Sequence, residues 1–169
     1  MSDHDAIDRF VESWGGMGSV WGINTSVARV HALLIASKRP YSLDEIAERL
    51  GISKSNASTS LKELRAWGVI RRIRETGERR DRYTAEADVW KMLFRILRER
   101  KRREFDPARA AVDQALSAGA GGGGELATDR LGQMKLLVDT LDQLAERLLA
   151  DEAQARQMLA FLTAGRSGT

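Results

Sequence analysis

Apolar residues recur every three or four positions along most of the chain, which is the spacing of amphipathic helices. In the first such segment, residues 5–21, the sequence GGMG interrupts the pattern, and we expect the helix to break or bend there. Beyond it, the pattern predicts helices at 25–37, 43–50, 53–67, 85–105, 107–118, 125–150 and 151–162. The chain is therefore expected to be mainly α.

Capping residues mark the ends of several of these helices. Asn24 and Thr25 are both candidate N-caps for the second one. The sequence SLDE is a capping box, with Ser42 as the N-cap and Glu45 three residues later. Gly51 is expected to end that helix in the left-handed conformation, and Ser53 to begin the next one.

Two short segments, 69–74 and 79–84, flank the sequence ETGE and predict the strands of a β-hairpin. Helix, capped helix, glycine turn, helix and hairpin, in this order, are typical of a winged helix-turn-helix. We therefore predict a mainly α fold with a small β-hairpin wing. The fold class is a winged helix-turn-helix, at 24–85, combined with a helical dimerisation region.

The last helix of this predicted motif carries serine, threonine and asparagine, which stabilise a helix less well than lysine or glutamate would. At about 100° per residue, Ala57, Leu61 and Leu64 share the side that faces the core. Short hydroxyl side chains on the opposite side can bond to phosphates or base edges without keeping the helix out of the major groove. We expect the DNA-reading residues to be Ser53, Lys54, Ser55, Asn56, Ser58, Thr59 and Lys62.

Arginines gather at the tip of the predicted hairpin. Arg79, Arg80 and Arg82 are placed where a wing would enter the adjacent minor groove, whose negative potential suits guanidinium groups. The alternative is that these arginines protect a sheet edge against aggregation. Ser42, which precedes the capped helix, is expected to contact the DNA backbone.

The charge of the chain is unevenly distributed. The net charge is only +3, yet residues 53–103 hold sixteen Lys or Arg against seven Asp or Glu. Such a basic block on an acidic remainder indicates a polyanion as the partner, and double-stranded DNA fits best. The alternative is a winged-helix adaptor that binds protein, but such a surface would be expected to be acidic or apolar around Ser55 and Thr59.

The composition argues against several other classes of protein. The chain has no cysteine and only two histidines, so a metal site is not expected. No nucleophile or phosphate-loop motif occurs, and the carboxylates Asp44, Glu45 and Glu48 are explained by the macrodipole at a helix N-terminus. We therefore expect that the protein binds no cofactor and is not an enzyme. His31 lies beside an apolar face and is expected to be either a satisfied or an exposed histidine rather than one that senses a ligand.

A leucine stripe runs along the segment that follows the glycine-rich linker at 119–124. Leu137, Leu141, Leu144 and Leu148 alternate three-and-four spacing, which is typical of a seam between two helices. The partner helix can belong to a second copy of the chain or to the core of a monomer. No apolar run is long enough for a membrane span, and the acidic start is unlike a secretory signal, so we expect a cytoplasmic protein.

The winged region resembles a known family. The sequences SLDEIAERLGISKSNASTSLKELRAWGVIRR and GERRDRYTAEADVWKMLFRILRERKRREFDP are similar to the GbsR-type branch of the MarR superfamily of bacterial transcriptional regulators. The opening FVESWG and the late segment LAERLLADEAQARQMLAFL are similar too. The GGMGS region and the polyglycine linker depart from the family pattern.

The resemblance implies a homodimer whose first and last helices form the interface, with Phe10 of the first helix joining Leu137, Leu141, Leu144 and Leu148. It also implies a repressor that responds to a small effector, such as an osmoprotectant or its precursor. Trp14, Trp21, Trp90 and Phe94 are candidate walls of the effector site, since aromatic faces suit quaternary ammonium groups. The alternative is that these aromatics are core residues.

The resulting organisation has six parts along the chain. These are a dimerisation helix at 1–23, the DNA-binding domain at 24–85, connecting helices at 86–118, a linker at 119–124, dimerisation helices at 125–163 and a tail at 164–169.

Overall fold

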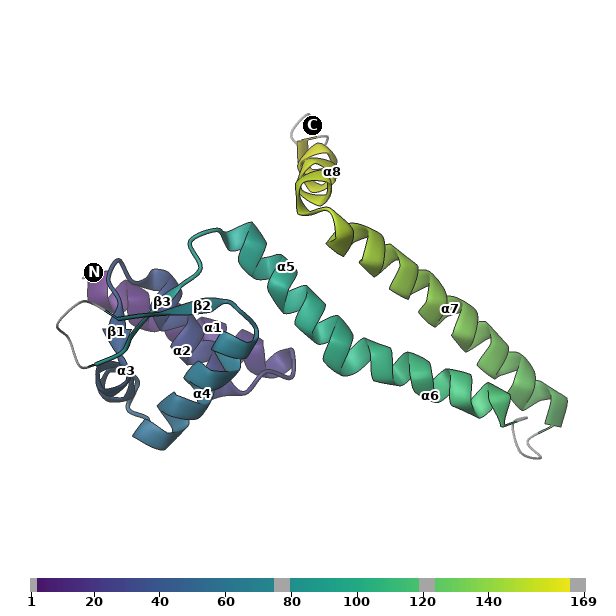
Figure 1. Cartoon of the computed structure of the whole chain (residues 1–169), viewed down its shortest axis with the longest axis horizontal. Helices are drawn as coiled ribbons and strands as arrows, with labels where there is room; N and C mark the ends of the chain where they lie inside the picture. The colour runs from purple at the N-terminus through teal and green to yellow at the C-terminus, as the bar shows by residue number, and fades with distance from the viewer. Residues whose placement is uncertain (1–2, 75–79, 119–123, 165–169) are drawn as a thin grey trace. The chain divides into compact units, whose positions relative to one another are not determined.

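The computed structural model describes residues 3–74, 80–118 and 124–164, which form two compact units that meet between Met92 and Leu93 (Figure 1). The first unit contains α1 (Asp3–Val20), α2 (Thr25–Ala36), β1 (Tyr41–Ser42), α3 (Leu43–Leu50), α4 (Lys54–Ala66), β2 (Ile70–Ile73) and β3 (Arg82–Ala85). The mainly α winged fold predicted from the sequence is confirmed.

Helix α1 is continuous, so the break predicted at GGMG is wrong. The glycines serve a close approach to α2 instead. A Cβ at Gly15 would lie 2.6 Å from Arg29 Cγ, and one at Gly18 would lie 2.5 Å from the Cβ of Ala28. Each glycine weakens the helix by about 1 kcal/mol relative to alanine, but only glycine lets the two backbones come this close.

The predicted helix caps are confirmed. The side chain of Asn24 accepts a hydrogen bond from the Ser26 N–H, at 2.9 Å. Ser42 and Glu45 form both bonds of the capping box. Gly51 ends α3 with a φ of 63°, in the left-handed region that favours glycine.

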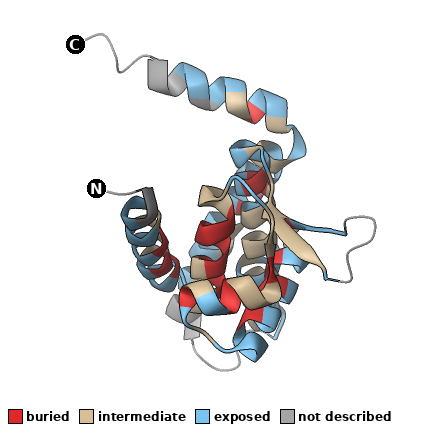
Figure 2. Cartoon of the chain, turned by 90° about the vertical axis from the view of Figure 1, so that its left-hand side faces the viewer, coloured by how far each residue is buried: buried red, intermediate tan, exposed pale blue. Residues whose placement is uncertain are grey.

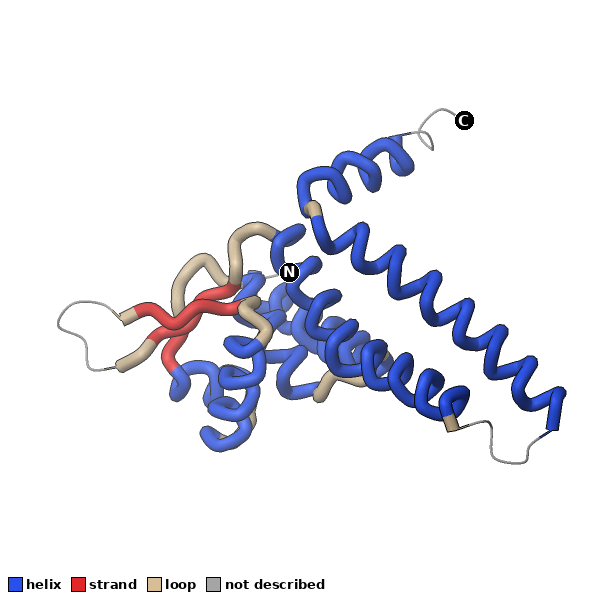
Figure 3. Tube along the Cα trace, turned by 45° about the vertical axis from the view of Figure 1, so that its right-hand side comes forward, coloured by secondary structure: helices blue, strands red, loops and turns tan. Residues whose placement is uncertain are grey.

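The sheet has three antiparallel strands in the order β1-β3-β2, and not only the two of the predicted hairpin (Figure 3). Strand β1 was missed because its two residues are too short for any alternation to be read from the sequence. It pairs Tyr41 with Tyr83 and Ser42 with Arg82. The sequence ETGE and Arg79 lie outside the described residues.

The core of the first unit forms where the inner faces of its helices meet the sheet (Figure 2). Ala57, Leu61 and Leu64 of α4 are buried, as their spacing predicted. They anchor this helix against the unit and leave its opposite side open to solvent.

The second unit begins at Leu93, inside the next helix of the chain, and contains the rest of that helical path and two further helices. Helix α5 (Val89–Arg100) starts later than predicted and continues through a π-helical turn, η1 (Lys101–Phe105), into α6 (Asp106–Ser117). The helix predicted to begin separately at 107 is therefore a continuation of α5, because Phe105 is already helical. The carboxylate of Asp106 binds Lys101, at 2.8 Å. Helices α7 (Gly124–Ala150) and α8 (Glu152–Ala164) follow.

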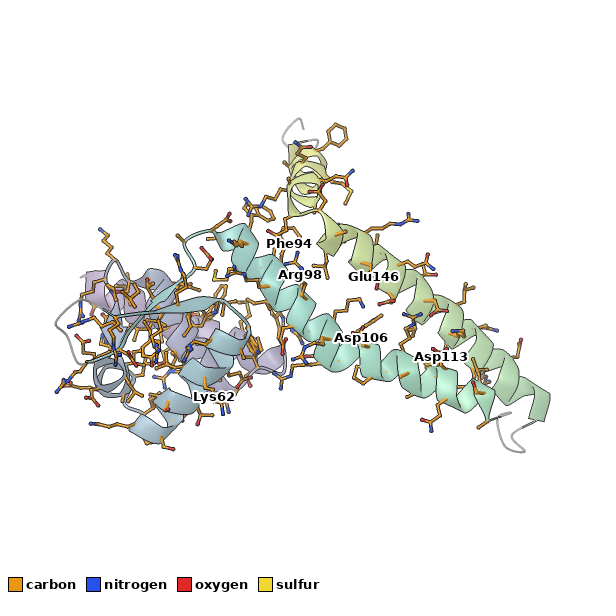
Figure 4. The ribbon with its side chains drawn as sticks, viewed as in Figure 1. Lys62, Phe94, Arg98, Asp106, Asp113 and Glu146 are labelled. Carbon is orange, nitrogen blue, oxygen red and sulfur yellow. The ribbon has the colours of Figure 1, made fainter. Side chains whose placement is uncertain are left out.

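Helices α6 and α7 lie side by side and run in opposite directions (Figures 1 and 3). Ion pairs join them. Arg109 binds Asp139 and Asp142, at 3.1 and 2.6 Å, and Lys135 binds Asp113 at 2.5 Å. The labelled carboxylates Asp106 and Asp113 come from the α6 side of this hairpin (Figure 4).

Large apolar side chains remain exposed on the described helices of the second unit. Leu137 is 57% exposed, and Leu141 and Leu144 are also open. On α5, Leu93 and Leu97 are exposed, while Phe94 is buried.

Candidate nucleic-acid interface

The solvent-facing side of α4 presents the polar residues predicted to read DNA. Ser55, Ser58, Thr59 and Lys62 are exposed on this helix, opposite its buried face. Lys62 is labelled on α4 in Figure 4. The hydroxyl groups supply donors and acceptors on short stems, which suits contact with base edges and phosphates.

The first turn of α4 is shaped by a side-chain cap. Ser53 caps the helix by accepting a hydrogen bond from the Asn56 N–H, at 3.1 Å. Its oxygen is therefore engaged in the fold, although the residue is exposed. The other early backbone N–H groups lie at the positive end of the helix, which favours anions.

The side chain of Asn56 links α4 to the start of α2. Its Nδ2 donates to the hydroxyl of Ser26, at 2.9 Å, and its Oδ1 lies 3.5 Å from the hydroxyl of buried Ser60. Sequence reasoning missed this contact, because Ser26 belongs to a helix far away in the chain.

Lys54 and Arg80, from the two predicted DNA-binding elements, approach the same carboxylate. Lys54 Nζ lies 2.6 Å from Asp44 Oδ1, and an Arg80 guanidinium nitrogen lies 3.9 Å from Asp44 Oδ2. Both cations lower the pKa of Asp44 below its usual value, and Lys54 has the larger effect.

The wing carries more exposed arginines than the sequence interpretation selected. Arg71, Arg72 and Arg74 on and beside β2 are exposed, as is Arg80. The first three were considered only as part of the basic block. Because neighbouring residues of a strand point to opposite faces, Arg71 and Arg72 face different sides of the wing.

Asp81 holds two of these arginines. Its carboxylate lies 3.1 Å from Arg72 and 3.5 Å from Arg74. The wing therefore carries its own counter-charge, and these contacts restrict the directions that the two guanidinium groups take.

Arg82 lies at the base of the wing and is largely covered. It is on the central strand β3, and its guanidinium lies 3.4 Å from Glu45 Oε2. Glu45 also accepts from the Ser42 N–H and binds Arg39 at 2.7 Å. The pKa of Glu45 is lowered to about 2, mainly by the hydrogen bond from the Ser42 N–H and also by Arg39.

Ser42 is only 6% exposed, and its hydroxyl oxygen accepts the cap bond from the Glu45 N–H, at 3.3 Å. This placement gives Ser42 a role in the fold. The contact with the DNA backbone expected for it stays a prediction.

The basic block at 53–103 is divided between the two units. In the second unit, Arg98 binds Glu152, Arg100 binds Glu104 and Arg102 binds Glu99. Each of these three cations is paired with a carboxylate of its own unit.

The residues proposed for an effector site differ in their environments. Trp14 packs on Phe10, with ring centroids 5.4 Å apart. Trp21 and Trp90 are exposed, and buried Phe94 belongs to the second unit. An effector cleft formed by these aromatics stays a prediction.

His31 is buried in the first unit, with its Nε2 3.0 Å from the sulfur of Met92. Burial lowers the pKa of His31 to about 4, so the imidazole is neutral at pH 7. This environment is that of a structural histidine, as expected from the sequence.

Metal-binding and membrane-spanning features are both absent from residues 3–74, 80–118 and 124–164. These residues contain no group of three or more His, Cys, Asp or Glu side chains placed to hold a metal ion. None of their helices has both the length and the apolar character needed to cross a bilayer.

The segment that forms most of the first unit matches a family of known proteins. Residues 21–81, from the end of α1 to the wing, match the model of the MarR family. This segment has the element order of a winged helix-turn-helix, and its sequence is similar to the MarR family. The polar face of α4 and the wing arginines from Arg71 to Arg80 lie within the matched residues.

Curated relatives from Bacillus subtilis (strain 168) have similar sequences. The helix-turn-helix protein YvaV is 28% identical over 91 residues, which are 54% of this chain and 51% of YvaV. The HTH-type transcriptional repressor OpcR is 28% identical over 76 residues, or 45% and 41% of the two chains. The HTH-type transcriptional repressor GbsR is 26% identical over 110 residues, or 65% and 61%. The matches thus span about half the length of these relatives.

A solved structure described as a transcriptional regulator shares the fold over most of the chain. It superposes with a TM-score of 0.67 and 22% identity, covering 88% of this chain and 99% of the other. The likeness of fold therefore extends beyond residues 21–81 into the helices that follow them.

Proposed function

We propose that the protein is a dimeric transcriptional regulator that binds double-stranded DNA in a sequence-specific manner. The observation that carries this proposal is the exposed polar face of α4 beside the exposed arginines of the wing. A helix with short hydroxyl side chains and lysines fits the major groove, and guanidinium groups fit the adjacent minor groove.

Within this proposal, the two elements have different roles. Ser55, Ser58, Thr59 and Asn56 on α4 read base edges, while Lys54 and Lys62 bind phosphates. Arg80 and the neighbouring wing arginines bind mainly through charge and through the shape of the minor groove.

A dimer is supported by the apolar side chains left open on α7. Leu137, Leu141 and Leu144 form part of the predicted stripe and are all exposed in the single chain. A second copy that covers them would place two winged domains on the half-sites of one operator. We assign residues 125–163 and, with Phe10, residues 1–23 to this interface, and we assign residues 24–85 to DNA binding.

Repression and a small effector are the finer parts of the proposal. OpcR and GbsR are named repressors, and the family resemblance suggests the GbsR-type branch. We infer that an osmoprotectant or its precursor acts on the protein in the cytoplasm, at a site walled by Trp14, Trp21, Trp90 and Phe94. A quaternary ammonium group would interact with such aromatic faces.

The second candidate function is a winged-helix adaptor that binds protein and not DNA. The ion pairs that Asp44 and Asp81 make with the cations of this face are compatible with it. However, an adaptor surface would be expected to expose an apolar anchor among the residues of α4 that point away from the core. The exposed residues between Ser53 and Lys62 are all polar or charged.

Selection of bound fragments from the organism's own genome tests the proposal directly. The full chain is incubated with sheared genomic DNA, and the retained fragments are sequenced. We expect a few enriched sites with inverted half-sites about one helical turn apart, as the geometry of dimeric helix-turn-helix proteins requires. Retention of fragments without any shared sequence would contradict sequence-specific binding, and no retention would favour the adaptor.

A further inference from the structure

One carboxylate lies between the two cationic elements of the candidate interface. The carboxylate of Asp44, in the first turn of α3, lies 2.6 Å from the Nζ of Lys54 at the start of α4. It lies 3.9 Å from the guanidinium of Arg80, two residues before β3. The two oxygens of the carboxylate are divided between the two cations, one to each. An anion at this place therefore joins the recognition helix to the wing.

The same arrangement is the one that a DNA phosphate would make. A phosphodiester offers two anionic oxygens, and in a winged domain it would be approached by a cation from each element. Lys54 and Arg80 remain 72% and 75% exposed, so both can turn from the carboxylate toward an external anion. Exposed ion pairs of this kind are weak and exchange readily.

Asp44 differs in this respect from two other carboxylates that bind cations of this domain, Glu45 and Asp81. Glu45 accepts a backbone N–H bond and ties Arg82 to α3, and Asp81 pairs with arginines inside the wing. These two carboxylates hold the fold of the wing. Asp44 is 45% exposed and faces cations that the fold leaves open to solvent.

We propose that Asp44 is an internal competitor for DNA phosphate, which occupies Lys54 and Arg80 in the free protein and lowers the affinity for DNA. The inference rests on the proposed function and assigns a regulatory residue to the same surface. Binding requires the two cations to exchange one anion for another, and the carboxylate then stays close to the phosphodiester chain and repels it. Because phosphate contacts supply most of the affinity for random DNA, Asp44 keeps that background binding weak.

The test compares Asp44→Asn with Glu48→Gln in the full chain, on an operator duplex and on a scrambled duplex of the same length. Both variants remove one negative charge from α3, and Glu48 is exposed one turn further along the same helix. No ion pair of Glu48 is found among the described residues. At about 0.1 M salt we expect Asp44→Asn to bind both duplexes about threefold to tenfold more tightly, with a steeper salt dependence. Glu48→Gln should change either affinity by less than about twofold.

Two further variants keep the result interpretable. Asp44→Ser is a second way to remove the carboxylate, with a residue that is accepted in the first turn of a helix. The melting temperatures of Asp44→Asn and Asp44→Ser then show whether either variant has a folding defect. In a Lys54→Gln, Arg80→Gln background, Asp44→Asn should have little remaining effect, because the cations for which the two anions compete are gone.

The outcomes separate the inference from the proposed function. Wild-type protein that binds neither duplex overturns both. Wild-type protein that prefers the operator supports the proposed function. In that case, equal changes of DNA affinity in Asp44→Asn and Glu48→Gln would overturn the inference alone, because they would indicate a general charge effect. Weaker binding by Asp44→Asn also overturns it, because Asp44 would then hold Lys54 and Arg80 in the productive position.

Discussion

The side-chain amide of Asn56 donates a hydrogen bond to the hydroxyl oxygen of Ser26, 2.9 Å away. The bond connects α4, the proposed recognition helix, to the start of α2, which packs on α1. A residue that was selected from the sequence for base recognition therefore also has a partner inside the domain.

This hydrogen bond defines the first prediction. Asn56→Ala should lower the affinity for the operator by about 1–3 kcal/mol and leave binding to random DNA nearly unchanged, because amide groups act on base edges. It should also lower the free energy of unfolding by up to about 1 kcal/mol, since the bond to Ser26 is removed. Ser26→Ala is the matched control, since it removes the same bond and keeps the amide. Equal decreases of operator affinity in the two variants would assign the effect to the position of α4 and not to base reading.

The wing arginines should divide into two groups. Arg80→Ala removes an exposed cation, and we expect similar decreases in affinity for operator and random DNA. The salt dependence should flatten by about 0.9 for each phosphate that is no longer neutralised. Arg82→Ala breaks the ion pair with Glu45 at the base of the wing and should mainly lower thermal stability. Fluorescence anisotropy across a salt series, together with thermal melts, measures both. An unchanged salt slope for Arg80→Ala would exclude phosphate binding by this residue.

His31 should make the stability of the domain dependent on pH. Its pKa is about 4 in the folded protein and about 6.5 in an unfolded chain, so between these values the unfolded state binds more protons. The neutral histidine therefore makes its full contribution to the free energy of unfolding above about pH 6.5. This contribution, up to about 3 kcal/mol, is lost as the pH falls toward 4. Urea unfolding at pH 8 and pH 5 should show a smaller loss for His31→Leu than for wild type. Parallel losses in the two proteins would mean that other groups cause the acid sensitivity.

The ion pairs between α6 and α7 should depend mostly on one buried carboxylate. Asp142 is 4% exposed and binds Arg109 and Lys101, at 2.6 and 2.8 Å. Asp142→Ala leaves these cations without their covered partner and should cost about 3 kcal/mol of unfolding free energy. Glu146 also approaches Lys101 but is 64% exposed, so Glu146→Ala should cost less than about 0.5 kcal/mol. Both are measured by urea unfolding at one fixed protein concentration; similar midpoints for the two variants would contradict this ranking.

The exposed leucines of α7 lead to a prediction about assembly. Leu141→Lys combined with Leu144→Lys should convert a dimer into a monomer in sedimentation experiments, because two charges would have to be buried in an apolar interface. Gln143→Lys introduces the same charge between these positions, off the stripe, and should leave the dimer intact. A double variant that remains dimeric would place the interface elsewhere on the chain.

Local signals made much of the first unit predictable. Caps and turn glycines act within a few residues, so Asn24, Ser42 and Gly51 were correctly assigned from the sequence alone. The helical spacing of Ala57, Leu61 and Leu64 was enough to predict the buried face of α4. The polar face was predicted as the side opposite to it.

Features that depend on distant parts of the chain were not predictable in this way. Gly15 and Gly18 have the local signature of a helix break, and only the neighbouring α2 explains why α1 continues through them. The same holds for the bond from Asn56 to Ser26 and for the carboxylate of Asp44, whose partners are brought together by the tertiary fold.

The close approach of α1 and α2 at the glycines of α1 also has a mechanical consequence. At Gly15 and Gly18 the α1 backbone lies directly against side-chain atoms of Arg29 and Ala28, so there is little soft material that could absorb a displacement of one helix against the other. The pair should therefore move as a rigid lever. In a dimer held through α1, a small rotation of this lever would be passed by α2 and the Ser26–Asn56 bond to α4, and would change the distance between the two recognition helices.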